Sequence, residues 1–107
     1  MNMKILERSF RGSVVCRTLG YPITYAITKL LLEQGPMELD EITRQVRRAK
    51  STVCGHLAKL RMANLVRFEK AGLKTCYWIK YERETREYLR SCERLGKRTT
   101  QKIDQDY

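Results

Sequence analysis

The stretch that decides the fold of this chain is LDEITRQVRRAKSTVCGHLAKLRMA, residues 39–63. Its apolar residues recur at helical spacing in two groups, which are Leu39, Ile42 and Val46, then Val53, Leu57 and Leu60. One apolar face per group predicts a helix of about two turns over residues 39–47 and a longer helix over residues 50–63. A brief turn separates the two, so the stretch predicts a helix-turn-helix motif.

Upstream of this motif, the sequence predicts three helical segments. Residues 3–11 form a short helix that Gly12-Ser13 interrupts, and Ser13 caps a second segment that runs to about Leu19. Gly20-Tyr21-Pro22 is a break, because proline suits the first turn of a new helix. That next helix ends at Gly35-Pro36. Its expected buried stripe is Ile23, Ala26, Ile27, Leu30 and Leu31.

Downstream of the motif, the pattern is that of a hairpin and a last helix. Asn64 suits a left-handed helix end, and residues 65–70 and 75–81 are strand-like, with Ala71-Gly72 in the turn between them. A charged helix is expected over residues 82–98, and the polar residues 99–107 are expected to fray. The apolar side of that helix is made of Tyr88, Leu89, Cys92 and Leu95.

This order of elements predicts a mainly α fold with a small β-hairpin, the winged helix-turn-helix, as one domain over residues 1–107. Residues 39–81 would form the helix-turn-helix and the wing. In such a motif the second helix lies in the major groove of DNA, while the first helix crosses the backbone. The fold class alone therefore suggests a nucleic-acid partner.

The distribution of charge points to the same part of the chain. The formal net charge is +10, and residues 44–74 hold nine basic residues against one acid, Glu69. Residues 1–43 carry equal numbers of basic and acidic residues. A concentrated positive field attracts a polyanion and speeds its capture. We therefore expect double-stranded DNA as the partner.

The residues expected to contact DNA lie on the second helix, around the turn before it and on the hairpin. The outward side of the helix, opposite its apolar stripe, is expected to hold Lys50, Ser51, Cys54, Ala58 and Arg61. Cations would neutralise phosphates, and the few outward residues would read bases. The full predicted set is Arg47, Arg48, Lys50, Ser51, Thr52, Cys54, Gly55, His56, Lys59, Lys70 and Lys74.

Five short motifs occur in order between residues 15 and 81. They are LGYP (19–22) with the helix after it, ELDEI (38–42), STVCGHL (51–57), LRMANLV (60–66) and KAG (70–72) with the residues to Tyr77. In this order and spacing they resemble the arsenic- and metal-responsive winged-helix repressors of the ArsR/SmtB type. Cys54 and Gly55 stand where that family has a serine and a histidine, so we expect a different preference for DNA sequence.

The resemblance implies a homodimeric transcriptional repressor that binds an inverted-repeat operator. In that family the N-terminal and C-terminal helices form the dimer interface, which here implies residues 1–20 and 82–98, with Tyr88, Leu89, Cys92 and Leu95 at the contact. The family's metal sites use cysteines near the start of the helix-turn-helix or ligands on the last helix. Residues 37–42 contain no cysteine and His56 is the chain's only histidine, so neither a metal site nor a cofactor is predicted.

The four cysteines contain no Cys-x-x-Cys pair, and reduced thiols are expected. The resemblance implies that Cys16 and Cys92 lie on helices that pack together. They would then bind a thiophile such as arsenite, form a regulatory disulfide, or serve only as small core residues. Cys54 is a third candidate sensor, because an outward thiol beside Lys50 and the two arginines before it would be open to oxidation on the reading surface.

Other classes of function fit the sequence less well. An enzyme is not expected, because there is one histidine, no phosphate loop and no nucleophile motif. An effector-independent DNA-binding or architectural protein, or a winged-helix protein-interaction module, remains the alternative; the latter should expose apolar anchors instead of a basic block. There is no membrane-length apolar run and no signal-peptide core, so a cytoplasmic protein without a membrane partner is expected.

Overall fold

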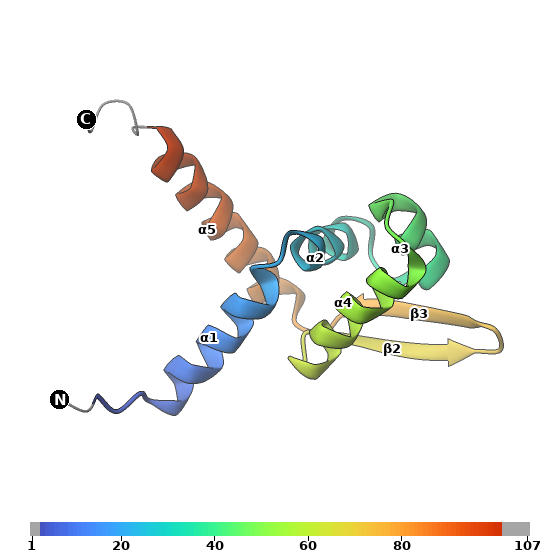
Figure 1. Cartoon of the computed structure of the whole chain (residues 1–107), viewed down its shortest axis with the longest axis horizontal. Coiled ribbons are helices and arrows are strands. Elements are labelled where there is room, and N and C mark those ends of the chain that lie inside the picture. The colour runs from blue at the N-terminus through green and yellow to red at the C-terminus, as the bar shows by residue number, and fades with distance from the viewer. Residues whose placement is uncertain (1–2, 102–107) are drawn as a thin grey trace.

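A computed structural model describes residues 3–101 of the chain and shows the winged helix-turn-helix that the sequence predicted. The described part spans 55 Å along its longest axis, with the hairpin at one end and two protruding helices at the other (Figure 1). The elements in chain order are α1 (Glu7–Leu19), α2 (Pro22–Gln34), β1 (Met37–Glu38), α3 (Leu39–Val46), α4 (Lys50–Met62), β2 (Val66–Ala71), β3 (Lys74–Ile79) and α5 (Glu82–Gln101).

The first helix differs from the prediction. The expected interruption at Gly12-Ser13 is absent, because α1 runs unbroken from Glu7, and residues 3–6 are not helical. The Ser13 hydroxyl donates to the carbonyl oxygen of Phe10 at 2.6 Å, so it bonds within the helix and caps nothing. A single exposed glycine costs a helix only about 1 kcal/mol. That cost alone is too small to break α1.

The core is built around α2, which contacts α1, α3, α4, α5 and β3. Ile27 and Leu31 are buried as predicted, but Ala26 is exposed. Thr24 and Thr28 are completely buried on this helix instead. The Thr28 hydroxyl donates to the carbonyl oxygen of Thr24 at 2.8 Å, and this hydrogen bond satisfies a polar group that would otherwise be costly to bury.

The wing contains one strand more than predicted. β1 pairs antiparallel with β3, so the sheet order is β1-β3-β2, and Met37 and Phe68 both lie opposite Tyr77. Two residues are too few to show the alternation by which a strand is recognised in a sequence. The turn is also shifted by one residue from the prediction, because Ala71 pairs with Lys74 and the chain reverses at Gly72-Leu73, where Gly72 has φ 64°.

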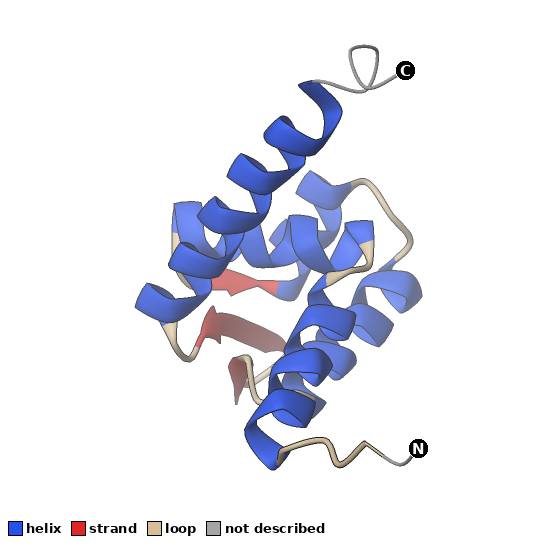
Figure 2. Cartoon of the chain, turned by 90° about the vertical axis from the view of Figure 1, so that its left-hand side faces the viewer, coloured by secondary structure: helices blue, strands red, loops and turns tan. Residues whose placement is uncertain are grey.

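The helices α1 and α5 project from the same side of the core and diverge, and both face the viewer in Figure 2. α5 continues to Gln101, so it includes residues 99–101, which were expected to fray, and residues 102–107 lie outside the described part. The Tyr25 hydroxyl donates to a carboxylate oxygen of Glu93 at 2.9 Å, and Lys29 pairs with the same carboxylate at 3.0 Å. These contacts fasten α5 to α2.

Burial, and then the hydrogen bond to Glu93, raise the pKa of Tyr25 to about 12. The Tyr25 hydroxyl therefore stays protonated and remains a hydrogen-bond donor at neutral pH.

None of the helices within residues 3–101 is long and apolar enough to cross a membrane.

Candidate nucleic-acid interface

The helix-turn-helix consists of α3, a short turn and α4. Arg47 ends α3 in the left-handed conformation, with φ 57°, and its amide donates to the carbonyl oxygen of Thr43 at 3.1 Å. Arg47 and Arg48 are exposed on this turn. Ala49 then occupies the N-cap of α4, with no side-chain hydrogen bond to the first free amides of the helix.

The missing cap predicts that Ala49→Ser stabilises the protein. A serine at this position should accept a hydrogen bond from an amide in the first turn of α4, for a gain of about 1 kcal/mol and a rise in Tm of roughly 4–8 °C. Thermal unfolding followed by circular dichroism measures the change. The matched control is Ala58→Ser in the middle of α4, where a hydroxyl should not stabilise. A Tm that is unchanged or lower in Ala49→Ser would show that the amides are satisfied otherwise.

The exposed stripe of α4 is rotated relative to the prediction. It runs through Ser51, Gly55, Lys59 and Met62, whereas Cys54 and Ala58 are half-buried. The wing covers the flank that helical spacing had assigned to the outside, so the expected outward thiol of Cys54 is not found.

Two aromatic side chains of the wing lie beside this flank. Burial, and then the proximity of Cys54, raise the pKa of Tyr77 on β3. The guanidinium of Arg61 lies 4.4 Å from the centre of the Phe68 ring on β2. Arg61 is therefore engaged by the hairpin through a cation–π contact.

His56 lies on the other flank of α4 and faces α2. Its Nδ1 atom is 2.8 Å from the hydroxyl oxygen of Thr24, and its ring centre is 6.3 Å from that of Tyr21. Burial, and then the charge of Lys59, lower the pKa of His56, so the ring is neutral at pH 7. These contacts give His56 a structural role, and Thr52 is likewise half-buried.

Carboxylates of β1 and of the first turn of α3 change the charge of the predicted interface. Lys50 pairs with Asp40 at 3.1 Å, Lys74 pairs with Glu38 at 3.8 Å, and Arg44 pairs with Glu41. In the sequence these acids belong to the neutral first part of the chain, but the fold brings them to the basic surface. Within residues 3–101, the cations of the basic block that form no ion pair are Arg47, Arg48, Lys59, Arg61, Arg67 and Lys70.

The tip of the wing carries a residue that the sequence reasoning missed. Leu73 is fully exposed beside Gly72 in the turn, and Lys70 and Lys74 are exposed on either side of it. An apolar residue at a hairpin tip is unusual for a solvated turn. Its place in the predicted turn was the available signal in the sequence.

Tyr88 on α5 lies near both Cys16 and Cys92. The hydrogen bond with Cys16, then burial, then the hydrogen bond with Cys92 raise the pKa of Tyr88 well above its usual value. The Tyr88 side chain is thus near an exposed thiol of α1 and a half-buried thiol of α5. The role of Tyr88 was missed, because sequence spacing does not show which tyrosine faces a neighbouring helix.

The residues predicted to form the dimer interface differ in how exposed they are. Leu89 is 4% exposed and belongs to the core of its own chain, so it is not available to a partner, and this part of the prediction is wrong. Tyr88 and Cys92 are half-buried, whereas Leu95 is 62% exposed. On the N-terminal side, exposed apolar side chains are Ile5, Leu6 and Phe10.

Within residues 3–101, no three potential ligands among His, Cys, Asp and Glu gather to hold a metal ion.

The model of the HVO_A0114 family matches residues 22–85, which is more than half of the chain. The chain belongs to the HVO_A0114 family. The matched segment runs from α2 through the helix-turn-helix and the wing to the first turn of α5, so it contains all of the candidate interface.

Relatives and solved structures place this family member among winged-helix proteins. The uncharacterized HTH-type transcriptional regulator MJ1325 of Methanocaldococcus jannaschii is 28% identical over 74 residues, covering 69% of this chain and 83% of that protein. HlyU from Vibrio cholerae has a TM-score of 0.75 at 21% identity, covering 85% of this chain and 97% of that one. The transcriptional repressor BigR from Xylella fastidiosa has a TM-score of 0.68 at 19% identity, covering 75% and 81%.

These likenesses establish the winged-helix fold for this HVO_A0114 family member. MJ1325 is named as a regulator of transcription and BigR as a transcriptional repressor. The finer resemblance to the ArsR/SmtB repressors, made from the five motifs, stays a prediction.

Proposed function

We propose that this HVO_A0114 family member is a homodimeric, sequence-specific DNA-binding regulator that represses transcription. The observation that carries the proposal is the exposed stripe of α4, which begins at Ser51. It lies between cations of the turn and the wing that form no ion pair within residues 3–101. Side chains at the start of α4 would reach base edges in the major groove, while Arg47, Arg48 and Lys70 contact phosphates. Repression is inferred from the resemblance to ArsR/SmtB proteins and from the name of BigR.

The wing would contact the groove next to the one that α4 enters. Lys70 and Lys74 are placed to reach phosphates, and the apolar tip residue Leu73 is suited to contact sugars in the minor groove. Lys50 and Lys74 would have to exchange their carboxylate partners for phosphates on binding. Their contribution to affinity should therefore be smaller than that of the unpaired cations.

Gly55→Glu tests the reading surface directly. A side chain added at Gly55 meets no atom within 4 Å, so the fold should be kept while a carboxylate stands in the middle of the exposed stripe. We expect a gel shift on the DNA upstream of the protein's own gene to disappear, because a carboxylate in a groove faces phosphates and base acceptors.

The matched control for this test is Ala26→Glu, which adds the same charge at an exposed position on α2. This variant should shift the DNA as the unchanged protein does. Loss of binding in both variants, or in neither, would contradict the assignment of α4 as the reading helix.

Dimerisation is proposed from two exposed apolar surfaces that lie apart from each other in the single chain. Ile5 and Leu6 lie just before α1, Phe10 lies in its first turn, and Leu95 lies in the second half of α5. Figure 1 shows these helix ends pointing apart on the side opposite the wing. A second copy related by a two-fold axis would cover both surfaces and would place two reading helices about one turn of DNA apart.

Release from DNA by a thiol-reactive agent is proposed from the cluster of Cys16, Tyr88 and Cys92. Oxidation would join the two sulfurs, with loss of two protons and two electrons to the oxidant. Arsenite would bind both thiols with release of two waters. Either bridge displaces the Tyr88 hydroxyl from the thiols and shifts α1 against α5, which changes the spacing of the reading helices.

Cys16→Ser and Cys92→Ser are therefore expected to bind DNA normally and to remain bound when arsenite or diamide is added. The unchanged protein should be released by the same treatment, and DNA-binding titrations by fluorescence anisotropy measure both states. Cys76→Ser, on β3, is the control and should respond like the unchanged protein. If both serine variants are still released from DNA by the treatment, Cys54 becomes the candidate sensor. If the unchanged protein stays bound to DNA under the same treatment, the result favours an effector-independent regulator.

A further inference from the structure

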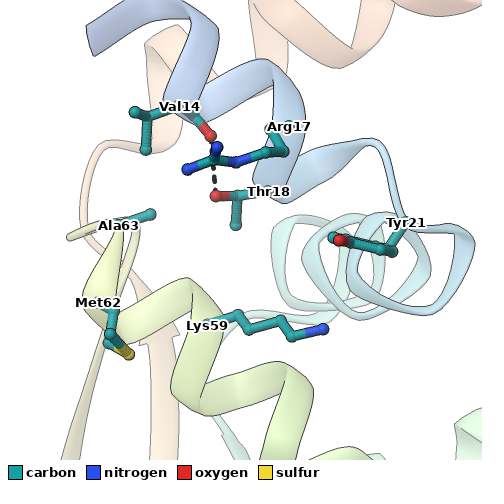
Figure 3. Close-up of a pocket in the computed structure, with 7 residues that line it drawn as sticks. All are labelled: Val14, Arg17, Thr18, Tyr21, Lys59, Met62 and Ala63. Carbon is teal, nitrogen blue, oxygen red and sulfur yellow. Dashed lines mark hydrogen bonds between the residues drawn. The ribbon is translucent and has the colours of Figure 1, made fainter.

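A cleft lies between α1 and the C-terminal end of α4. Its volume is about 330 Å³, which is within the size range of small-molecule sites. In Figure 3, residues of α1 border one side of the cleft, residues of α4 border the other, and Tyr21 closes one end. The cleft thus joins a helix proposed for dimerisation to the helix proposed to read DNA.

The walls of this cleft are mostly apolar. Val14 on α1 and Ala63 at the end of α4 form the inner surface, and Met62 lies at the rim. The Met62 side chain is 88% exposed, so nothing else in residues 3–101 covers it. The Thr18 hydroxyl donates to the carbonyl oxygen of Val14 at 2.8 Å, and its donor is therefore used within α1.

The charges at the cleft are of one sign. Arg17 and Lys59 line it from opposite helices, no carboxylate lines it, and neither cation forms an ion pair within residues 3–101. The Lys59 Nζ atom lies 4.3 Å from the centre of the Tyr21 ring. The same charge contributes to the lowered pKa of His56 behind that ring. Two cations beside an apolar wall create a positive potential that no group of the cleft neutralises.

We propose that this cleft binds a small apolar carboxylate, of about the size of a two-ring aromatic acid. The carboxylate would lie between Arg17 and Lys59, and the rings would lie against Tyr21, Val14 and Met62. Because such a ligand contacts α1 and α4 together, it would fix the end of the reading helix relative to the dimer helix. This regulatory consequence rests on the proposed function, whereas the binding itself does not.

The test is a titration of the full-length, isotope-labelled protein with 1-naphthoate, without DNA, followed by amide resonances in NMR spectra. Shifts are expected around Val14, Thr18 and Ala63. The neutral amide of the same acid should bind much more weakly. Arg17→Gln should reduce the affinity for naphthoate by about tenfold or more, which is the effect of losing a charge-assisted hydrogen bond. Arg11→Gln, on the same helix but outside the cleft, should bind as the unchanged protein does.

Three outcomes would overturn the proposal. If the neutral amide binds as tightly as naphthoate, the two cations play no part in binding. If Arg17→Gln binds naphthoate as tightly as the unchanged protein does, Arg17 does not bind the carboxylate. Matching shifts with inorganic phosphate would instead make the cleft part of the phosphate-binding surface for DNA. A second measurement tests the regulatory link: saturating naphthoate should change DNA affinity in the unchanged protein but not in Arg17→Gln, and an unchanged affinity would overturn that link alone.

Discussion

The double variant Phe10→Asp, Leu95→Asp is expected to be a monomer that binds DNA at least 100-fold more weakly than the unchanged protein. Both side chains are more than half exposed, so the substitutions leave the core of the single chain intact. They would place carboxylates in the apolar contact between copies, where an unpaired charge is costly. Sedimentation equilibrium at micromolar concentration measures the assembly, and anisotropy titrations measure the affinity.

The control for this variant is Phe10→Leu, Leu95→Met, which keeps both positions apolar and should remain dimeric. A double aspartate variant that sediments as a dimer would show that the contact between copies lies elsewhere. A monomer that keeps full affinity for DNA would contradict the proposal that two reading helices act together.

The triple variant Arg47→Asn, Arg48→Gln, Lys70→Gln is expected to lose affinity for all DNA sequences. Asparagine is chosen at residue 47 because that residue has φ 57°, and asparagine tolerates the left-handed conformation. Each phosphate contact that is lost should reduce the slope of log affinity against log salt by about 0.9. Three contacts per chain would lower the affinity by roughly a hundredfold or more at moderate salt. Titrations over a series of salt concentrations measure the slope.

A second triple variant with the same loss of positive charge distinguishes specific phosphate contacts from a general effect of net charge. Arg83→Gln, Arg90→Gln, Lys97→Gln removes three exposed cations from α5 and changes the net charge by the same amount. Its slope should stay close to that of the unchanged protein. An equal decrease in both triple variants would mean that DNA responds to the overall charge and that the turn and wing make no special contacts.

Much of the fold was predictable because helices and breaks leave strong local signals. The apolar spacing found α2, α3 and α4. Gly35 ends α2 as expected, and Asn64 has the positive φ of 62° expected of a left-handed residue after α4. Local sequence signals failed where an element forms only by pairing with a segment that is distant in the sequence. β1 exists only because it pairs with β3, which follows some 35 residues later in the chain.

The candidate site was predicted less well than the fold for the same physical reason. Helical spacing identified the buried stripe of α4, but only tertiary packing decides that the wing covers Cys54 and that α2 covers His56. A count of charges along the chain likewise missed the pairing of Lys50 with Asp40. The proximity of Tyr88 to thiols on α1 and α5 depends on where the fold places these two helices, so no motif revealed it.

The most direct test of the central claim is selection of bound sequences from a duplex library with a randomised stretch of about three helical turns. A homodimer that reads DNA through α4 should enrich an inverted repeat whose half-sites are centred about one helical turn apart. Gly55→Glu should enrich nothing from the same library. Enrichment of isolated half-sites, or the absence of any enriched sequence with the unchanged protein, would contradict the account.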